Sequence, residues 1–257
     1  MKDAVTPTNW SSKYTFEDVA PLIENAQVRL RDLLKDYLEV GGDKRIAYQR
    51  YLTFQYHMTR GVQTYFMRVA ASSRLARMRP LRKFFVNFAN EEELHYLVAA
   101  SDLKALDMEI LPQPFDVALW HAYFDKVTDD HPFIRVGAAL ILENISAGVA
   151  SPYVKEALAA PFLNRENTKF LVLHQHEILP HGDQLIEALT KAPLTDRDVE
   201  ELILGGQQGT VLYLRMAEWA VKHDDPSVLA RNVHAFAEAI DHEEISRFSM
   251  ADLELDD

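Results

Sequence analysis

The stretch Phe170–Asp183, FLVLHQHEILPHGD, carries three of the ten histidines in this chain of 257 residues. A continuous α-helix turns by roughly 100° per residue, so His174, Glu177 and His181 would share one face of it. Imidazole and carboxylate groups on an otherwise apolar helix are typical of a metal site inside a helical bundle. Pro180 removes one backbone donor, so we expect the helix to kink there. The alternative is a histidine-rich turn at the surface.

The rest of the chain is also patterned as helices. Apolar residues recur every three or four positions, and no run has the alternation typical of a β-hairpin. We therefore predict an all-α bundle of about seven to eight helices in a single domain, 1–257, with residues 1–14 irregular. Glycines at 205, 206 and 209 would weaken or bend the seventh helix. The predicted helices cover about 19–40, 44–74, 80–106, 115–127, 133–150, 170–183, 196–223 and 226–250.

The composition excludes several classes of protein. Without cysteine the chain has no disulfide, zinc–thiolate site or cysteine nucleophile, which favours an intracellular, cytoplasmic protein. The polar N-terminus lacks a secretory apolar run, and we see no stretch that approaches the roughly 20 apolar residues of a membrane span. A net charge of −12 argues against general nucleic-acid binding.

A basic segment interrupts this acidic chain. From Lys44 to Asn90 there is no Asp or Glu, and five cations fall within the ten residues Arg74–Lys83, RLARMRPLRK. The simpler interpretation is a solvated turn between two helices. The alternative is a docking patch for an acidic partner or an anionic substrate, formed by Arg74, Arg77, Arg79, Arg82 and Lys83.

Two further helices carry candidate ligands. In the predicted helix 80–106, Glu92 and His95 lie on the apolar face, and their Glu-x-x-His spacing points both side chains toward one place. Between Arg135 and Lys155 the only charged side chain is Glu143. A buried carboxylate is costly unless it is paired, protonated or bound to metal, so Glu143 is a candidate ligand or the partner of a buried cation.

The predicted helix 44–74 offers His57 as its one side chain of a common ligand type. An ordinary core or half-buried histidine is the simpler interpretation of His57.

These motifs resemble those of the heme-oxygenase-like fold, and more narrowly of the heme-oxygenase-like di-iron oxidases and their TenA/PqqC relatives. The resemblance rests on Glu92-x-x-His95, the lone Glu143 and the histidines at 174 and 181, and covers the chain from about residue 47 onward. In that family the late helix resembles His-x-x-x-Asp-x-x-His, and here Ile178 stands where the aspartate is expected. The early glutamate of the family is also missing. The metal ligands that the resemblance implies are Glu92, His95, Glu143, His174 and His181, with Glu177 as a replacement for the aspartate and His57 on the early helix.

The resemblance implies an iron-dependent oxidase or oxygenase that acts on a small molecule with O2, with one or two Fe ions and Mn as an alternative. Because Ile178 leaves the site poor in negative charge, we expect one tightly held ion and a weak second site. Two alternatives stay open: a cofactor-free oxidase similar to PqqC, with Arg60 and Arg68 near His57, and a non-enzymatic binding protein. The absence of cysteine and of a histidine before His57 disfavours a TenA thiaminase and a true heme oxygenase. A homodimer is the default assembly.

Overall fold

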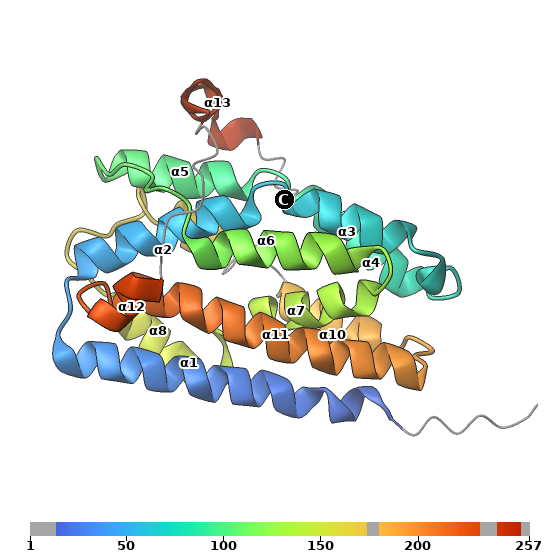
Figure 1. Ribbon diagram of the computed structural model, residues 1–257. Coiled ribbons are helices and arrows are strands. Elements are labelled where there is room, and N and C mark those ends of the chain that lie inside the picture. The colour runs from blue at the N-terminus through green and yellow to red at the C-terminus, as the bar shows by residue number, and fades with distance from the viewer. Residues whose placement is uncertain (1–13, 174–179, 232–240, 253–257) are drawn as a thin grey trace, which may run out of the picture.

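The computed structural model describes residues 14–173, 180–231 and 241–252, and within these ranges the chain is helical with no β-strand, which confirms the all-α prediction (Figure 1). The helices are shorter and more numerous than predicted because several predicted helices are divided. They are α1 (Ala20–Val40), α2 (Lys44–Thr59), α3 (Val62–Ala71), α4 (Arg79–Glu91), α5 (His95–Ala105), α6 (Phe115–Thr128), α7 (Pro132–Asn144), α8 (Ser151–Leu158), α9 (Lys169–Leu173), α10 (His181–Thr190), α11 (Asp196–Val221), α12 (Pro226–Arg231) and α13 (His242–Arg247).

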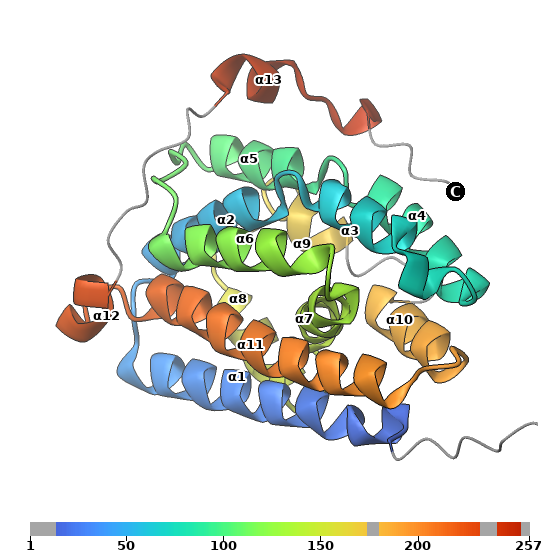
Figure 2. The same cartoon turned by 45° about the vertical axis from the view of Figure 1, so that its right-hand side comes forward.

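Helix α7 is the centre of the bundle. Figure 2 views it nearly end-on, with α6, α10 and α11 around it, and it also packs against α1 and α3. All its residues except Leu142 and Glu143 are buried. Segment Pro132–Leu158 has the length and hydropathy of a membrane span, and 67% of its most apolar window is buried inside the protein. The expectation that no stretch has this character is therefore wrong, because a helix at the centre of a bundle is apolar on every side.

Close packing against α7 explains the glycines of α11. A Cβ atom added at Gly205 would lie 1.9 Å from the carbonyl oxygen of Ile134, and one added at Gly137 would lie 2.2 Å from that of Leu202. Glycine is needed where two backbones approach this closely. Helix α11 continues through these glycines as one helix of 26 residues, so they do not interrupt it.

Three predicted helices end earlier than expected. The predicted helix 44–74 divides at Arg60–Gly61, where Gly61 has a φ of +76°, and the predicted helix 80–106 divides at residues 92–94, between α4 and α5. The predicted helix 170–183 does not continue through Pro180, whose extended ψ of 143° places it before the first turn of α10. A proline at this position cannot donate to the preceding turn, so a new helix begins at His181.

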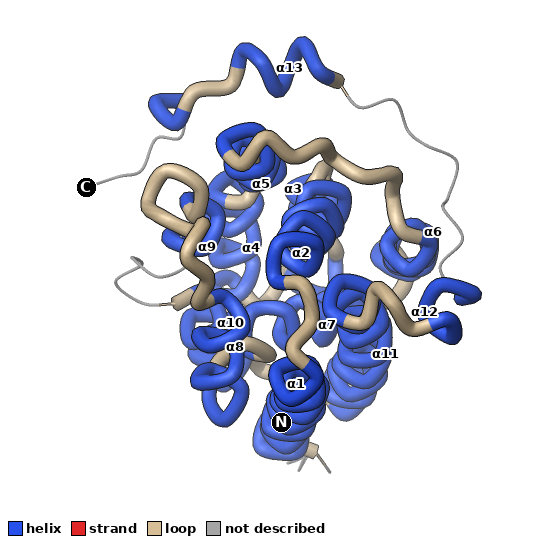
Figure 3. The backbone as a smooth tube through the Cα atoms, turned by 90° about the vertical axis from the view of Figure 1, so that its left-hand side faces the viewer, coloured by secondary structure: helices blue, strands red, loops and turns tan. Residues whose placement is uncertain are grey.

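The remaining elements close the ends of the bundle. Thr15 and Asp18 form a capping box ahead of α1, with the Thr15 amide donating to Asp18 at 2.8 Å. The predicted helix 226–250 is represented by α12 and α13, between which residues 232–240 lie outside the described residues. Seen along the bundle, α13 crosses above α5, where the Tyr96 hydroxyl donates to Glu244 at 2.5 Å (Figure 3).

Candidate metal centre

Four of the predicted ligands come together where the α4–α5 turn, the end of α7 and the start of α10 meet. The Nδ1 atom of His95 lies 2.9 Å from Glu92 Oε2. The Nδ1 atom of His181 lies 3.4 Å from Glu92 Oε1 and 3.9 Å from Glu143 Oε2. We call Glu92, His95, Glu143 and His181 the carboxylate–imidazole cluster. Three helical segments far apart in the sequence thus contribute to one small volume.

The break between α4 and α5 orients the first pair of side chains. Glu92 is the C-cap of α4, with its amide donating to Phe88, and His95 is the first residue of α5. The ring of Phe88 packs edge-on against His181, with 4.6 Å between ring centroids. Glu92 and His95 are only 5% and 6% exposed, so the turn directs a charged and an ionisable group into the protein interior.

Gly182 allows α10 to approach α7 at the cluster. A Cβ atom at this position would lie 2.5 Å from Oδ1 of Asn144, the residue after Glu143. The Asn144 side chain is itself held by a bond from Nδ2 to the carbonyl of Leu140 at 2.8 Å. A larger residue at 182 would therefore push His181 away from Glu143.

The charges of the cluster affect the pKa of His95. Burial alone would lower the pKa of this imidazole, but the adjacent Glu92 carboxylate more than offsets that effect, and the pKa is raised. The Glu92 carboxylate thus favours the protonated form of the His95 imidazole despite its burial.

A buried arginine lies near the cluster on α7. Arg135 is 1% exposed, and its guanidinium packs 4.7 Å from the ring centroid of Phe66 and 5.6 Å from those of Trp120 and Phe124. Burial lowers its pKa to about 10, while the charges of Glu143 and Glu92 oppose that change. Arg135 therefore stays a cation at neutral pH and partly offsets the two carboxylates.

Sequence reasoning missed Glu91. Its Oε2 lies 2.6 Å from Nε2 of His181, although the Glu91 side chain is 53% exposed. On a helix Glu91 lies about 100° around the axis from Glu92, so helical periodicity does not single it out. Its contact with His181 depends on the packing of α10 against α4, which no signal in the sequence marked.

The other predicted ligands lie outside this cluster or outside the described residues. Nε2 of His57 donates to the carbonyl of Leu111 at 2.9 Å, which favours the interpretation of His57 as a core histidine. His174 and Glu177, together with Ile178, fall within residues 174–179, which the structure does not describe. The predicted helical spacing of seven between His174 and His181 does not apply, because α10 begins at His181.

The contacts within the cluster are pairwise. Among the described residues no three carboxylate or imidazole groups close around one point. Each imidazole instead lies against a carboxylate, His95 on Glu92 and His181 on Glu91. Two buried imidazoles beside two carboxylates are nevertheless a nitrogen and oxygen donor set suited to iron or manganese.

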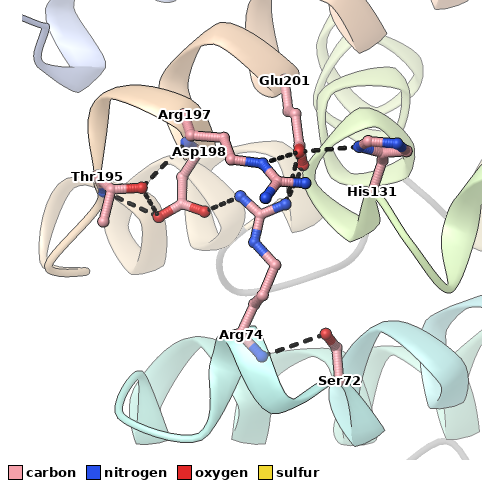
Figure 4. Close-up of polar contacts among 7 residues, drawn as sticks. All are labelled: Ser72, Arg74, His131, Thr195, Arg197, Asp198 and Glu201. Carbon is pink, nitrogen blue, oxygen red and sulfur yellow. Dashed lines mark hydrogen bonds and ion pairs between the residues drawn. The ribbon is translucent and has the colours of Figure 1, made fainter.

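The basic segment is anchored at its first residue. Arg74 pairs with Asp198 and Glu201 of α11, and His131 and Arg197 also contact Glu201 (Figure 4). Arg74 therefore ties the α3–α4 connection to α11 and is not available to an outside partner. The exposed remainder of the segment is Arg77, Arg79, Arg82 and Lys83.

Comparison with known proteins identifies the architecture. No family model and no curated protein matches the sequence. The structure is similar to the crystal structure of a domain of unknown function with a heme oxygenase-like fold from Shewanella denitrificans, with a TM-score of 0.66 and 19% sequence identity. The similarity covers 86% of this chain and 96% of that one. The chain is an all-helical protein of the heme-oxygenase-like fold.

Proposed function

We propose that this protein is an iron-dependent oxidase or oxygenase that acts on a small organic substrate with O2, with manganese as an alternative metal. The observation that carries the proposal is that Nδ1 of His181 lies 3.4 Å from Glu92 and 3.9 Å from Glu143, although the three residues come from three separate helical segments. Two carboxylates beside one buried imidazole are costly unless a cation offsets their charge. A bound iron ion would supply electrons to O2.

The chain's own residues have distinct roles in this proposal. Glu92 and Glu143 would neutralise the ion, while His95 and His181 would each donate a nitrogen lone pair. Glu91 positions His181, because Nε2–H of that ring donates to Glu91 and leaves Nδ1 directed toward Glu92 and Glu143. His174 and Glu177 are proposed to complete the ligand set, with one ion held tightly.

The fold and the burial of the cluster support an enzyme with a shielded site. The imidazoles lose the proton at the coordinating nitrogen when metal binds, so affinity should fall at low pH. We also propose that the protein forms a homodimer and is located in the cytoplasm.

Adjacent glutamates provide a matched test. Glu92→Gln should weaken binding of Fe(II) by at least about tenfold, whereas Glu93→Gln, which changes an exposed neighbour, should leave it unchanged. Binding is measured by anaerobic titration of metal-free protein, followed by O2 consumption of the iron-loaded forms. Equal affinity in the two variants would contradict the assignment of Glu92.

A non-enzymatic binding protein is the second candidate. It is favoured by the pairwise closure of the cluster, in which His181 already lies 2.6 Å from Glu91. If the titration detects no binding of Fe(II) or Mn(II) to the unmodified protein, this candidate replaces the first.

A further inference from the structure

A polar cavity lies at the break between α2 and α3. Its volume is about 400 Å³, and it opens where Gly61 separates the two helices and faces α6. Small-molecule pockets begin at roughly 300 Å³, so this volume suits a compact ligand. None of its lining residues belongs to the carboxylate–imidazole cluster. The lining includes Arg60, Thr64, Tyr65, Gln113, His121 and Asp125.

One wall of the cavity is a fixed pair of rings. Tyr65 and His121 stack with 6.0 Å between centroids and 21° between planes. Nε2 of His121 lies 2.8 Å from the backbone carbonyl of His57, and since a carbonyl only accepts, this nitrogen carries the proton. The hydrogen bond fixes the orientation of His121, and with it a flat aromatic surface.

Gln113 brings a side-chain amide to the cavity wall. The residue is only 8% exposed, and its amide can donate or accept a hydrogen bond with a polar group of a ligand in the cavity.

The charge around the cavity favours an anion. Arg60 lines it directly, and the guanidinium of Arg135 lies behind its wall, 5.7 Å from the Tyr65 ring centroid. The one acidic lining residue, Asp125, pairs with Arg68 at 2.6 Å, and Arg68 also pairs with Asp129 at 2.8 Å. Arg60 is the cation that lines the cavity itself, and on a chain with a net charge of −12 it attracts anions to this place.

We propose that this cavity binds a small planar carboxylate, with Arg60 and Gln113 holding the carboxylate group and the Tyr65–His121 pair covering the ring. Guanidinium groups pair well with carboxylates, and flat rings pack well on aromatic side chains. This site is separate from the proposed metal centre and does not depend on it.

Benzoate is the simplest probe, and benzamide is its neutral match. Titration of metal-free protein, followed by NMR, should show saturable binding of benzoate in the millimolar range, with shifts at Gly61, Thr64 and the Gln113 side-chain amide. Benzamide should bind at least about tenfold more weakly, a difference of about 1.4 kcal/mol. Equal binding of both probes, no binding of benzoate, or shifts centred on the carboxylate–imidazole cluster would overturn the proposal.

Two variants test the assigned residues. Arg60→Gln should weaken benzoate binding by at least about tenfold, whereas Arg82→Gln, which removes an exposed cation on α4, should not change it. Gln113→Leu should also weaken benzoate binding. If this variant fails to fold, the comparison of Arg60→Gln with Arg82→Gln still tests the proposal. Unchanged affinity in Arg60→Gln would overturn the proposal. Repeating the titration with iron-loaded protein should give the same result, so failure of the proposed function would not affect this test.

Discussion

At the scale of a single residue, Asp102 shows how burial and hydrogen bonding compete. The side chain is fully buried, and its Oδ2 accepts a hydrogen bond from the Phe170 amide at 2.9 Å, which joins α5 to the start of α9. Burial raises the pKa of Asp102 to about 6, although the Phe170 and Lys169 amides oppose the change. The folded protein thus binds this proton more tightly than the unfolded chain, and stability falls as pH rises from about 4 to about 6.

The variant Asp102→Asn should gain stability relative to the unmodified protein as pH rises. An asparagine keeps an acceptor for the Phe170 amide and carries no charge, so it avoids the cost of burying a carboxylate. Urea unfolding at pH 4.5 and pH 7.5 measures the difference. The exposed Asp107→Asn is the control and should show no such dependence. The account would be contradicted if the free energy of unfolding differed between Asp102→Asn and the unmodified protein by the same amount at both pH values.

The glutamate run shows what residue-level reasoning could and could not find. The Glu-x-x-His spacing predicted that Glu92 and His95 point to one place, and the lone charge of Glu143 marked it as a candidate ligand, although the structure leaves its side chain 16% exposed. The structure brings these side chains together. Glu91 was missed because its contact with His181 depends on packing between α4 and α10 and not on local sequence.

At the scale of elements, the contact between α7 and α11 is the most sensitive to substitution. An alanine in a helix interior is normally favoured over glycine by about 1 kcal/mol. In Gly205→Ala, however, the new Cβ would meet the backbone of Ile134, which cannot move without separating the helices. We expect a net loss of about 2 kcal/mol or more in the free energy of unfolding, measured with urea.

The neighbouring Gly206→Ala is the matched control. Its Cβ would lie 3.1 Å from Cδ1 of Leu22, the end of a flexible side chain. The free energy of unfolding should therefore change by less than about 1 kcal/mol. Equal effects of the two substitutions would show that backbone contact does not determine this packing.

Helix boundaries were predicted less well than helix positions. The helix predicted at 115–127 and the helix start predicted at Asp196 follow from local signals, and the structure confirms them as Phe115–Thr128 and Asp196–Val221. The division at 92–94 has no proline or glycine to mark it. The break at Gly61 could have been found, because glycine readily adopts positive φ.

At the scale of the whole molecule, the bundle brings residues 92, 143 and 181 together around a central helix. The all-α class and the heme-oxygenase-like fold could be predicted because helical periodicity and the ligand spacing pointed to the same arrangement. The full ligand set could not, since His174 and Glu177 lie outside the described residues. The basic segment was predicted to be a solvated turn or a docking patch at the surface. In the structure its first residue, Arg74, links the α3–α4 connection to α11.

The measurement that tests the metal assignment most directly is anomalous diffraction at the iron edge from crystals of iron-loaded protein. The account predicts an anomalous peak between the α4–α5 turn, α7 and α10, about 2 Å from oxygen or nitrogen atoms of Glu92, His95, Glu143 and His181. An anomalous peak elsewhere in the molecule, or crystals that take up no iron, would contradict it.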